Sequence, residues 1–123
     1  KAEAGAEERA LEMVLSPGLT PAGAVLISRR LKGLPEELTS GLRQLEISPR
    51  TQAIWDRIAV RLEQHGGAAL AIDYGEEGPL GDTLQAIKDH QFCDIMDDPG
   101  SADLSAYVDF GAMRQVVEDR EVA

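Results

Sequence analysis

The chain has 123 residues, of which 43% are hydrophobic, so it can bury the core of one domain or of part of one. Its net charge of -10 disfavours a nucleic-acid partner, because phosphate binding needs a basic face. No apolar run approaches the roughly 18 residues of a membrane span, and no signal or transit peptide is visible. The single cysteine, Cys93, excludes an internal disulfide. Because the chain begins at Lys1 rather than Met, we expect a processed chain or a piece of a longer protein.

The negative charge lies almost entirely after residue 72. Residues 1–72 carry nine acidic and nine basic side chains, whereas residues 73–109 carry ten acidic side chains and a single basic one, Lys88. This asymmetry favours a cationic partner or substrate. The alternative is a solvated acidic surface that serves solubility.

The first fifteen residues give weak structural signals. Residues 1–8 are rich in Ala and Glu and are expected to be a tail or a frayed helix. Residues 10–15 alternate apolar and polar side chains, which predicts a short strand, with a helix continuing from Glu7 as the alternative.

Two helices are indicated by a capping residue followed by proline. Thr-Pro at 20–21 and Ser-Pro at 48–49 each place an N-cap before proline at the first helical position. They predict helices over residues 21–31 and 49–65, the first ending near Gly33. The segment between them is expected to hold a connector or a short helical turn and then a brief strand.

An uninterrupted apolar run at residues 68–72, bounded by glycines, predicts a strand buried on both faces of a parallel sheet. A buried helix is the alternative, since periodicity alone does not separate the two. With the brief strand expected over residues 44–47 and the helix over 49–65, this strand would complete a βαβ unit. Asp73 and Tyr74 would then lie at its carboxyl end, where ligands bind in open α/β sheets. Asp73 could instead cap the following turn.

Beyond this strand, Asp82 is expected to cap a short amphipathic helix that holds Leu84 and Ile87. Residues 97–100, Asp-Asp-Pro-Gly, predict a turn. Asp109 is expected to cap a final helix with four apolar side chains inward, namely Phe110, Met113, Val116 and Val117.

His90 and Cys93 have a spacing that occurs in metal sites. A structural zinc site needs four ligands, and the only other histidine is His65, so we expect no metal. The unperturbed pKa of histidine lies near neutrality, which would suit His90 as a proton shuttle or a substrate contact. A structural hydrogen-bonding role is the alternative.

Six stretches occur in an order that is characteristic in combination. They are Leu-Ser-Pro at 15–17, Thr-Pro-Ala at 20–22, Glu-Ile-Ser-Pro at 46–49, Gly-Gly-Ala-Ala-Leu-Ala-Ile-Asp-Tyr-Gly at 66–75, Asp-Thr-Leu-Gln-Ala at 82–86 with His90, and Asp-Pro-Gly-Ser-Ala-Asp-Leu-Ser-Ala-Tyr-Val-Asp-Phe at 98–110. Together they resemble the MidA family of S-adenosylmethionine-dependent methyltransferases. The stretches after residue 82 are more similar to its mitochondrial branch, which includes a complex I assembly factor.

The resemblance implies an α/β fold, the carboxyl-terminal half of a Rossmann-like class I methyltransferase sheet with flanking helices. Residues 9–117 would be this carboxyl-terminal portion, between tails at 1–8 and 118–123. The chain has no Gly-x-Gly turn before a helix, so the resemblance implies that S-adenosylmethionine is bound mainly by a preceding half that these residues do not contain. We expect this part to be inactive by itself.

The resemblance also implies a substrate, an arginine on a respiratory complex I subunit, and a location in the mitochondrial matrix. Carboxylates can accept the paired N–H donors of a guanidinium group. We therefore expect Asp73 and Tyr74 to be catalytic and five further residues to be on the substrate side, namely Glu46, Gly75, His90, Asp103 and Asp109. Helix capping would equally explain Asp109, and a structural role would explain Glu46. A homo-oligomer is left open, and the alternative function is a non-catalytic acidic docking module for an assembly intermediate.

Overall fold

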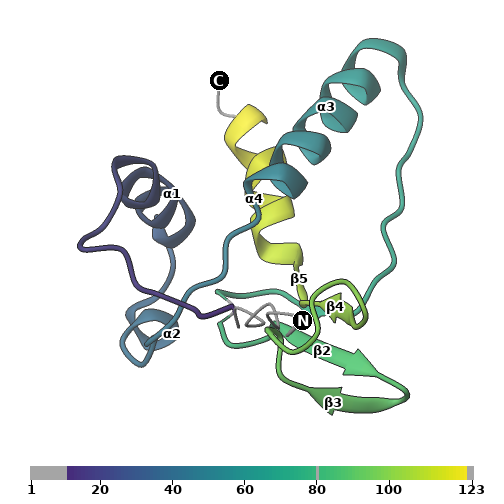
Figure 1. Cartoon of the computed structure of the whole chain (residues 1–123). Coiled ribbons are helices and arrows are strands. Elements are labelled where there is room, and N and C mark those ends of the chain that lie inside the picture. Colours follow the sequence, from purple (N-terminus) through teal and green to yellow (C-terminus); the bar gives the residue numbers. More distant parts are fainter. Residues whose placement is uncertain (1–10, 80, 122–123) are drawn as a thin grey trace, which may run out of the picture.

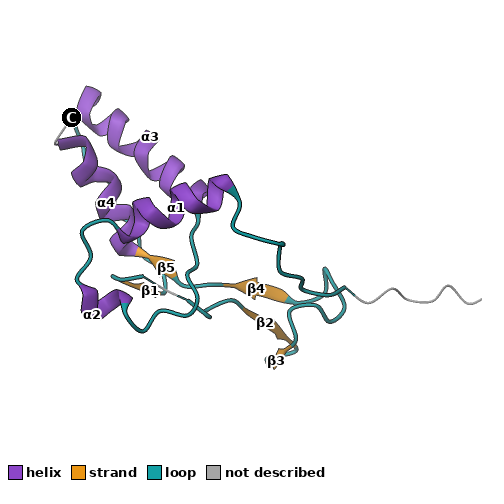
Figure 2. Cartoon of the chain, turned by 90° about the vertical axis from the view of Figure 1, so that its left-hand side faces the viewer, coloured by secondary structure: helices purple, strands orange, loops and turns teal. Residues whose placement is uncertain are grey.

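A computed structural model describes residues 11–79 and 81–121. The elements of this part are α1 (Pro21–Leu31), α2 (Glu36–Thr39), α3 (Pro49–His65), β1 (Gly75–Glu76), β2 (Gln85–Lys88), β3 (Gln91–Cys93), β4 (Asp103–Ser105), β5 (Val108–Asp109) and α4 (Phe110–Glu121). Helices α1, α3 and α4 lie on one side of the strands (Figure 2). This is a mixed α/β arrangement, consistent with part of a methyltransferase fold. The predicted tail at 1–8 lies outside the described residues, and α4 includes residues 118–121.

Local capping chemistry sets the helix boundaries. The Thr20 hydroxyl accepts a hydrogen bond from the Gly23 amide at 3.0 Å, and the Ser48 hydroxyl accepts one from the Thr51 amide at 3.4 Å. Each satisfies an amide that the first turn of a helix leaves free. Helix α3 ends at Gly66, whose φ of 69° is costly for other residues. The predictions of α1 and α3 are confirmed, as is the short helical turn, which is α2.

Strand β2 is the centre of a three-stranded antiparallel sheet of order β3-β2-β4. Asp89 and His90 connect β2 to β3 with φ values of 51° and 62°, which match a two-residue hairpin turn of type I′. The predicted helix after Asp82 is therefore wrong. Leu84 and Ile87 suit one helix face, but residues 85–88 instead satisfy their backbone groups against strands on both edges.

Strands β1 and β5 form a parallel pair in which Gly75 is opposite Val108. The Val108 amide donates to the Tyr74 carbonyl at 3.0 Å, just before the pair begins. A Cβ atom added to Gly75 would collide with the Val108 backbone carbonyl. Glycine is thus required here because the two backbones approach so closely.

Three predicted strands are wrong in the described part of the chain. Residues 11–15 of the segment predicted at 10–15, and the segments at 44–47 and 68–72, have no strand pairing. The last of these runs as an extended connection from α3 to β1 (Figure 1), and Leu70 and Ile72 are 84% and 85% exposed. An apolar run becomes a buried strand only where neighbouring strands pair its backbone and other elements cover its faces, and among the described residues that pairing begins at β1.

Helices α3 and α4 lie side by side (Figure 1). Arg120 on α4 joins them, because it donates to Glu63 at 2.9 and 2.6 Å and to Asp56 at 2.8 Å, both on α3. Met113 and Val116 are buried as predicted, whereas the other two side chains expected to point inward are half-buried. None of the described helices is long and apolar enough to cross a membrane.

Candidate functional site

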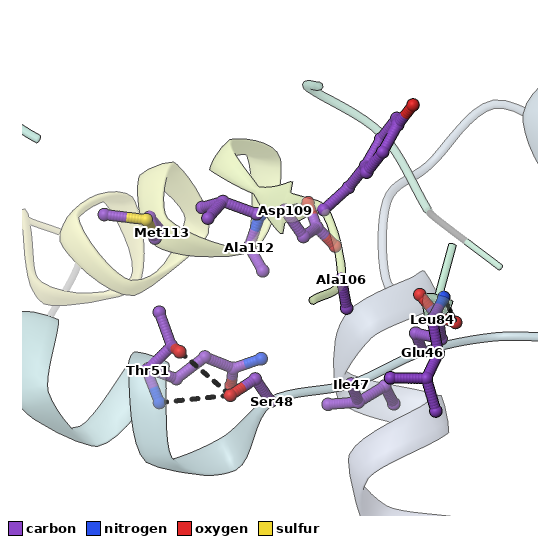
Figure 3. A pocket seen from close by; sticks show the side chains of 12 residues that line it. Glu46, Ile47, Ser48, Thr51, Leu84, Ala106, Asp109, Ala112 and Met113 are labelled. Atoms are coloured by element: carbon purple, nitrogen blue, oxygen red, sulfur yellow. Dashed lines mark hydrogen bonds between the residues drawn. The ribbon is translucent and has the colours of Figure 1, made fainter. Parts of the chain in front are cut away.

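A pocket of about 330 Å³ lies where the start of α3, the segment before β2 and the start of α4 meet. Ala112 and Met113 on α4 face Ser48 and Thr51 at the start of α3, with Ile47 toward the other end (Figure 3). Most of the lining is apolar, and its two carboxylates are Glu46 and Asp109, both predicted as substrate-side residues. The surroundings of these two carboxylates decide what the pocket can bind.

Asp109 is fully engaged by protein groups. Arg30 donates to its two carboxylate oxygens, from Nε at 2.6 Å and from Nη2 at 2.8 Å, and the Ala112 amide donates to it at 2.9 Å. Arg30 is 3% exposed, so this is a buried bidentate ion pair. Asp109 therefore caps α4 as expected. The role of Arg30 was missed, because three basic residues at the end of α1 are explained by the helix dipole alone.

Glu46 is engaged in a similar way. Its carboxylate accepts from the Thr83 amide at 2.9 Å, from the Thr83 hydroxyl and from the Leu84 amide at 3.1 Å. Burial acts to raise the pKa of Glu46, but the hydrogen bonds from Thr83 and Leu84 outweigh it, and the pKa lies below its ordinary value. Glu46 thus holds the segment before β2 against the segment before α3.

Two tyrosines form the aromatic edge of the site. The rings of Tyr74 and Tyr107 meet edge to face, with centroids 4.6 Å apart and planes at 88°. Tyr74 is 71% exposed, whereas Tyr107 is half-buried and lines the pocket. A hydrogen bond with Tyr74, partial burial and the charge of nearby Glu76 raise the pKa of Tyr107 above its ordinary value. Tyr107 was not among the predicted site residues.

The remaining predicted site residues are divided between two places. Asp73 is exposed, and its Oδ1 accepts from the Tyr74 amide at 2.7 Å. With Tyr74 it precedes β1, so the expectation that the two residues follow a strand is wrong for the described strands. His90, in the hairpin turn, and Asp103, on β4, are exposed on the antiparallel sheet and do not line the pocket. Gly75 contributes through its backbone, as described above.

A comparison of the whole sequence with protein families decides the class of the protein. A family model described as "Putative S-adenosyl-L-methionine-dependent methyltransferase" matches residues 2–123. The chain belongs to this methyltransferase family. The match covers nearly the entire chain and agrees with the resemblance to the MidA family.

Curated relatives of this family member are named as arginine methyltransferases. The chain is 40% identical over 116 residues to "Protein arginine methyltransferase NDUFAF7 homolog, mitochondrial" of Drosophila melanogaster. The aligned region is 94% of the chain and 25% of that protein. It is 33% identical over 110 residues to the Homo sapiens protein named "Protein arginine methyltransferase NDUFAF7, mitochondrial". This aligned region is 89% of the chain and 23% of the human protein. The chain therefore spans about a quarter of the length of these relatives.

The chain lacks the glycine-rich turn that usually holds a nucleoside-containing cofactor. Binding of a nucleoside-containing cofactor at a Rossmann-like sheet uses a glycine-rich turn that leads from a strand into a helix. The chain has no Gly-x-Gly turn, and the two carboxylates of the pocket are already occupied by Arg30 and by Thr83. Nor do the described residues place three or more His, Cys, Asp or Glu side chains where they could hold a metal ion.

Proposed function

We propose that the chain forms the carboxyl-terminal, substrate-side part of an S-adenosylmethionine-dependent protein arginine methyltransferase that acts on a respiratory complex I subunit during assembly of that complex in the mitochondrial matrix. Family membership and the names of the relatives support the reaction class and the mitochondrial location. The complex I substrate rests on the resemblance to the mitochondrial branch. We propose that the cofactor is held mainly by a part of the full-length protein outside these residues.

The observation that carries the proposal is a pair of tyrosines, exposed Tyr74 and half-buried Tyr107, beside carboxylates that form no salt bridge among the described residues. Among the described residues, neither Asp73 nor Glu76 forms a salt bridge, whereas Asp98 and Glu77 do. Asp73 directly precedes Tyr74, and the charge of Glu76 acts on Tyr107. An aromatic face attracts a guanidinium group, and a carboxylate accepts its N–H donors. This edge suits an arginine side chain in both respects.

The work of the chain in this proposal is positioning. When bound, S-adenosylmethionine supplies the methyl group. Transfer to a guanidinium nitrogen requires that nitrogen to be held in line, and holding reactants in the right geometry can account for much of a rate enhancement. Asp73 and Tyr74 are assigned to hold the guanidinium group, and Asp109 and Glu46 to shape the wall behind it. His90 and Asp103 would contact the substrate chain farther from the methylated side chain.

The test uses the full-length protein, S-adenosylmethionine with an isotopically labelled methyl group, and complex I assembly intermediates from cells that lack the enzyme. Mass spectrometry should locate the label on an arginine of one subunit. Label on lysine alone, or no label on any subunit, would overturn the proposal.

An Asp73→Asn variant then tests the site. It should lower turnover roughly tenfold or more, because a hydrogen bond to a charged group is worth about 1.5–3 kcal/mol. Asp97→Asn is the matched control, since Asp97 is also an exposed aspartate but lies in a turn of the antiparallel part. Undiminished turnover of the folded Asp73 variant, or unfolding of that variant, would remove Asp73 from the site. The alternative of a non-catalytic docking module finds no support in the names of these relatives.

A further inference from the structure

A continuous set of contacts leads from Glu46 to the pair formed by Tyr107 and Tyr74. The Glu46 carboxylate accepts from the Thr83 hydroxyl, and that hydroxyl oxygen accepts in turn from the Tyr107 amide at 3.0 Å. The Tyr107 ring packs against the ring of Tyr74. Glu46 and Tyr107 lie far apart in the sequence, and Thr83 connects them.

The chemistry of the Thr83 hydroxyl gives this set of contacts a direction. A hydroxyl group has one proton and two lone pairs. The ionised Glu46 carboxylate only accepts, so Thr83 must point its proton at Glu46 and a lone pair at the Tyr107 amide. The Thr83 amide also donates to Glu46, which fixes the threonine backbone as well as its side chain. Glu46 therefore determines how the backbone at Tyr107 is held.

We propose that Glu46 is a positioning residue that acts through Thr83 to hold Tyr107 beside Tyr74, and that these two tyrosine rings form the binding face for the arginine guanidinium group of the protein substrate. This inference rests on the proposed function and names a further part of the same site. It assigns a contact role to Tyr107, and it gives Glu46 an indirect role in place of direct substrate contact.

Charge and exposure favour a cation as the occupant of this face. Tyr74 is 71% exposed, so its ring is accessible to a substrate. Asp73 adjoins the pair in the sequence, and Glu76 is near enough for its charge to raise the pKa of Tyr107. A neutral phenol beside two carboxylates offers an electron-rich ring face in a negative field. Such a face binds a guanidinium group more tightly than it binds an uncharged isostere.

The first measurement is binding to the full-length protein without turnover. The probes are a capped Gly-Arg-Gly peptide and the same peptide with citrulline, an uncharged analogue of arginine. Binding is measured by NMR titration of the peptide signals. Wild type should prefer the arginine peptide. Tyr107→Leu should weaken its binding about three- to thirtyfold and leave citrulline binding unchanged. Tyr107→Phe keeps the ring and should bind as wild type does. If Tyr107→Leu does not fold, Tyr74→Leu tests the same face at an exposed position.

The second measurement tests the indirect role of Glu46. Thr83→Val removes the bridging hydroxyl group at nearly constant shape and should raise the KM for an arginine substrate more than it lowers kcat. Thr83→Ser restores the hydroxyl and should restore KM. Glu46→Gln should change KM and kcat in the same way as Thr83→Val. The double variant should show little further change in KM beyond that of either single variant.

Three results would overturn the inference. They are equal weakening of the arginine and citrulline peptides by Tyr107→Leu, no preference of wild type for arginine, and a Thr83→Ser variant that behaves as Thr83→Val does. A wild-type protein that prefers the arginine peptide but methylates no arginine would refute the proposed function and leave the binding face standing. The two proposals therefore fail separately.

Discussion

Replacement of Asp109 by asparagine isolates the contribution of a single buried charge. The new amide side chain would keep an oxygen for the Ala112 amide, and asparagine caps helices about as well as aspartate does. The variant would lose the charge that Arg30 pairs with at 2.6 and 2.8 Å. The guanidinium group of Arg30, 3% exposed, would then be buried without a counter-ion.

The size of the effect follows from this burial. Removal of one partner of a buried ion pair costs about 3–5 kcal/mol, because the remaining charge stays desolvated. Asp119→Asn is the matched control: it makes the same substitution in the pair between Asp119 and Arg29, whose side chains are 41% and 52% exposed. An exposed pair of this kind contributes less than about 1 kcal/mol. The two variants should differ by at least about 2 kcal/mol.

Amide hydrogen exchange of the full-length protein measures the effect locally. In the Asp109→Asn variant, exchange in α1 and α4 should accelerate by about two orders of magnitude, since about 3 kcal/mol corresponds to that factor. A double variant with Arg30→Met as well should recover much of the protection, because it no longer buries an unpaired charge. If Asp109→Asn and Asp119→Asn accelerate exchange equally, the argument from burial is refuted.

Two further predictions concern the parallel pair and the response to acid. Gly75→Ala should lower the melting temperature, because the added Cβ displaces Val108 at a cost of roughly 1–3 kcal/mol for overpacking. Gly78→Ala is the control and should leave the melting temperature unchanged, since an added Cβ there meets nothing within 4 Å. Equal melting temperatures of the two variants would contradict this prediction. Because the pKa of Glu46 is lowered in the folded state, its contribution to stability is complete above the ordinary value of 4.5 and is lost as the pH falls through the lowered value. Urea midpoints measured against pH should therefore fall less steeply below pH 4.5 in Glu46→Gln than in wild type, and parallel curves would count against the assigned hydrogen bonds.

Where structure depends on neighbouring residues, the sequence predicted it well. Thr20 and Ser48 each stand beside a proline, and the hydroxyl–amide bonds that begin α1 and α3 span only three residues. Asp109, which has no adjoining proline, was predicted as a cap from its place before an apolar run, and its side chain accepts from the Ala112 amide three residues later. Such bonds are encoded within one turn of the chain.

Where structure depends on distant partners, prediction failed. The spacing of Leu84 and Ile87 suits one face of a helix, whereas the strands that pair with β2 lie later in the chain and leave no local signal. The run at 68–72 has the composition of a buried strand, but composition does not reveal whether a partner is present to pair it. The family resemblance did not remove this difficulty, because it described the fold of a longer protein.

In the candidate site, too, contacts within one turn of the chain were predicted and contacts between distant residues were not. The carboxylates of Glu46 and Asp109 suit an arginine substrate by residue type, and in the structure they make the structural contacts that were their alternative interpretation. Their partners were not predicted, because Arg30 is 79 residues from Asp109 and Thr83 is 37 residues from Glu46. Tyr107 was overlooked because its significance comes from the ring beside it.

The 79-residue separation between Arg30 and Asp109 has a consequence for biosynthesis. Helix α1 leaves the ribosome long before Asp109 has been translated, so its buried arginine has no counter-ion during most of the synthesis of this region. Contacts between residues this far apart close a long loop and slow folding. Docking of α1 through this ion pair is therefore completed only after β5 has emerged.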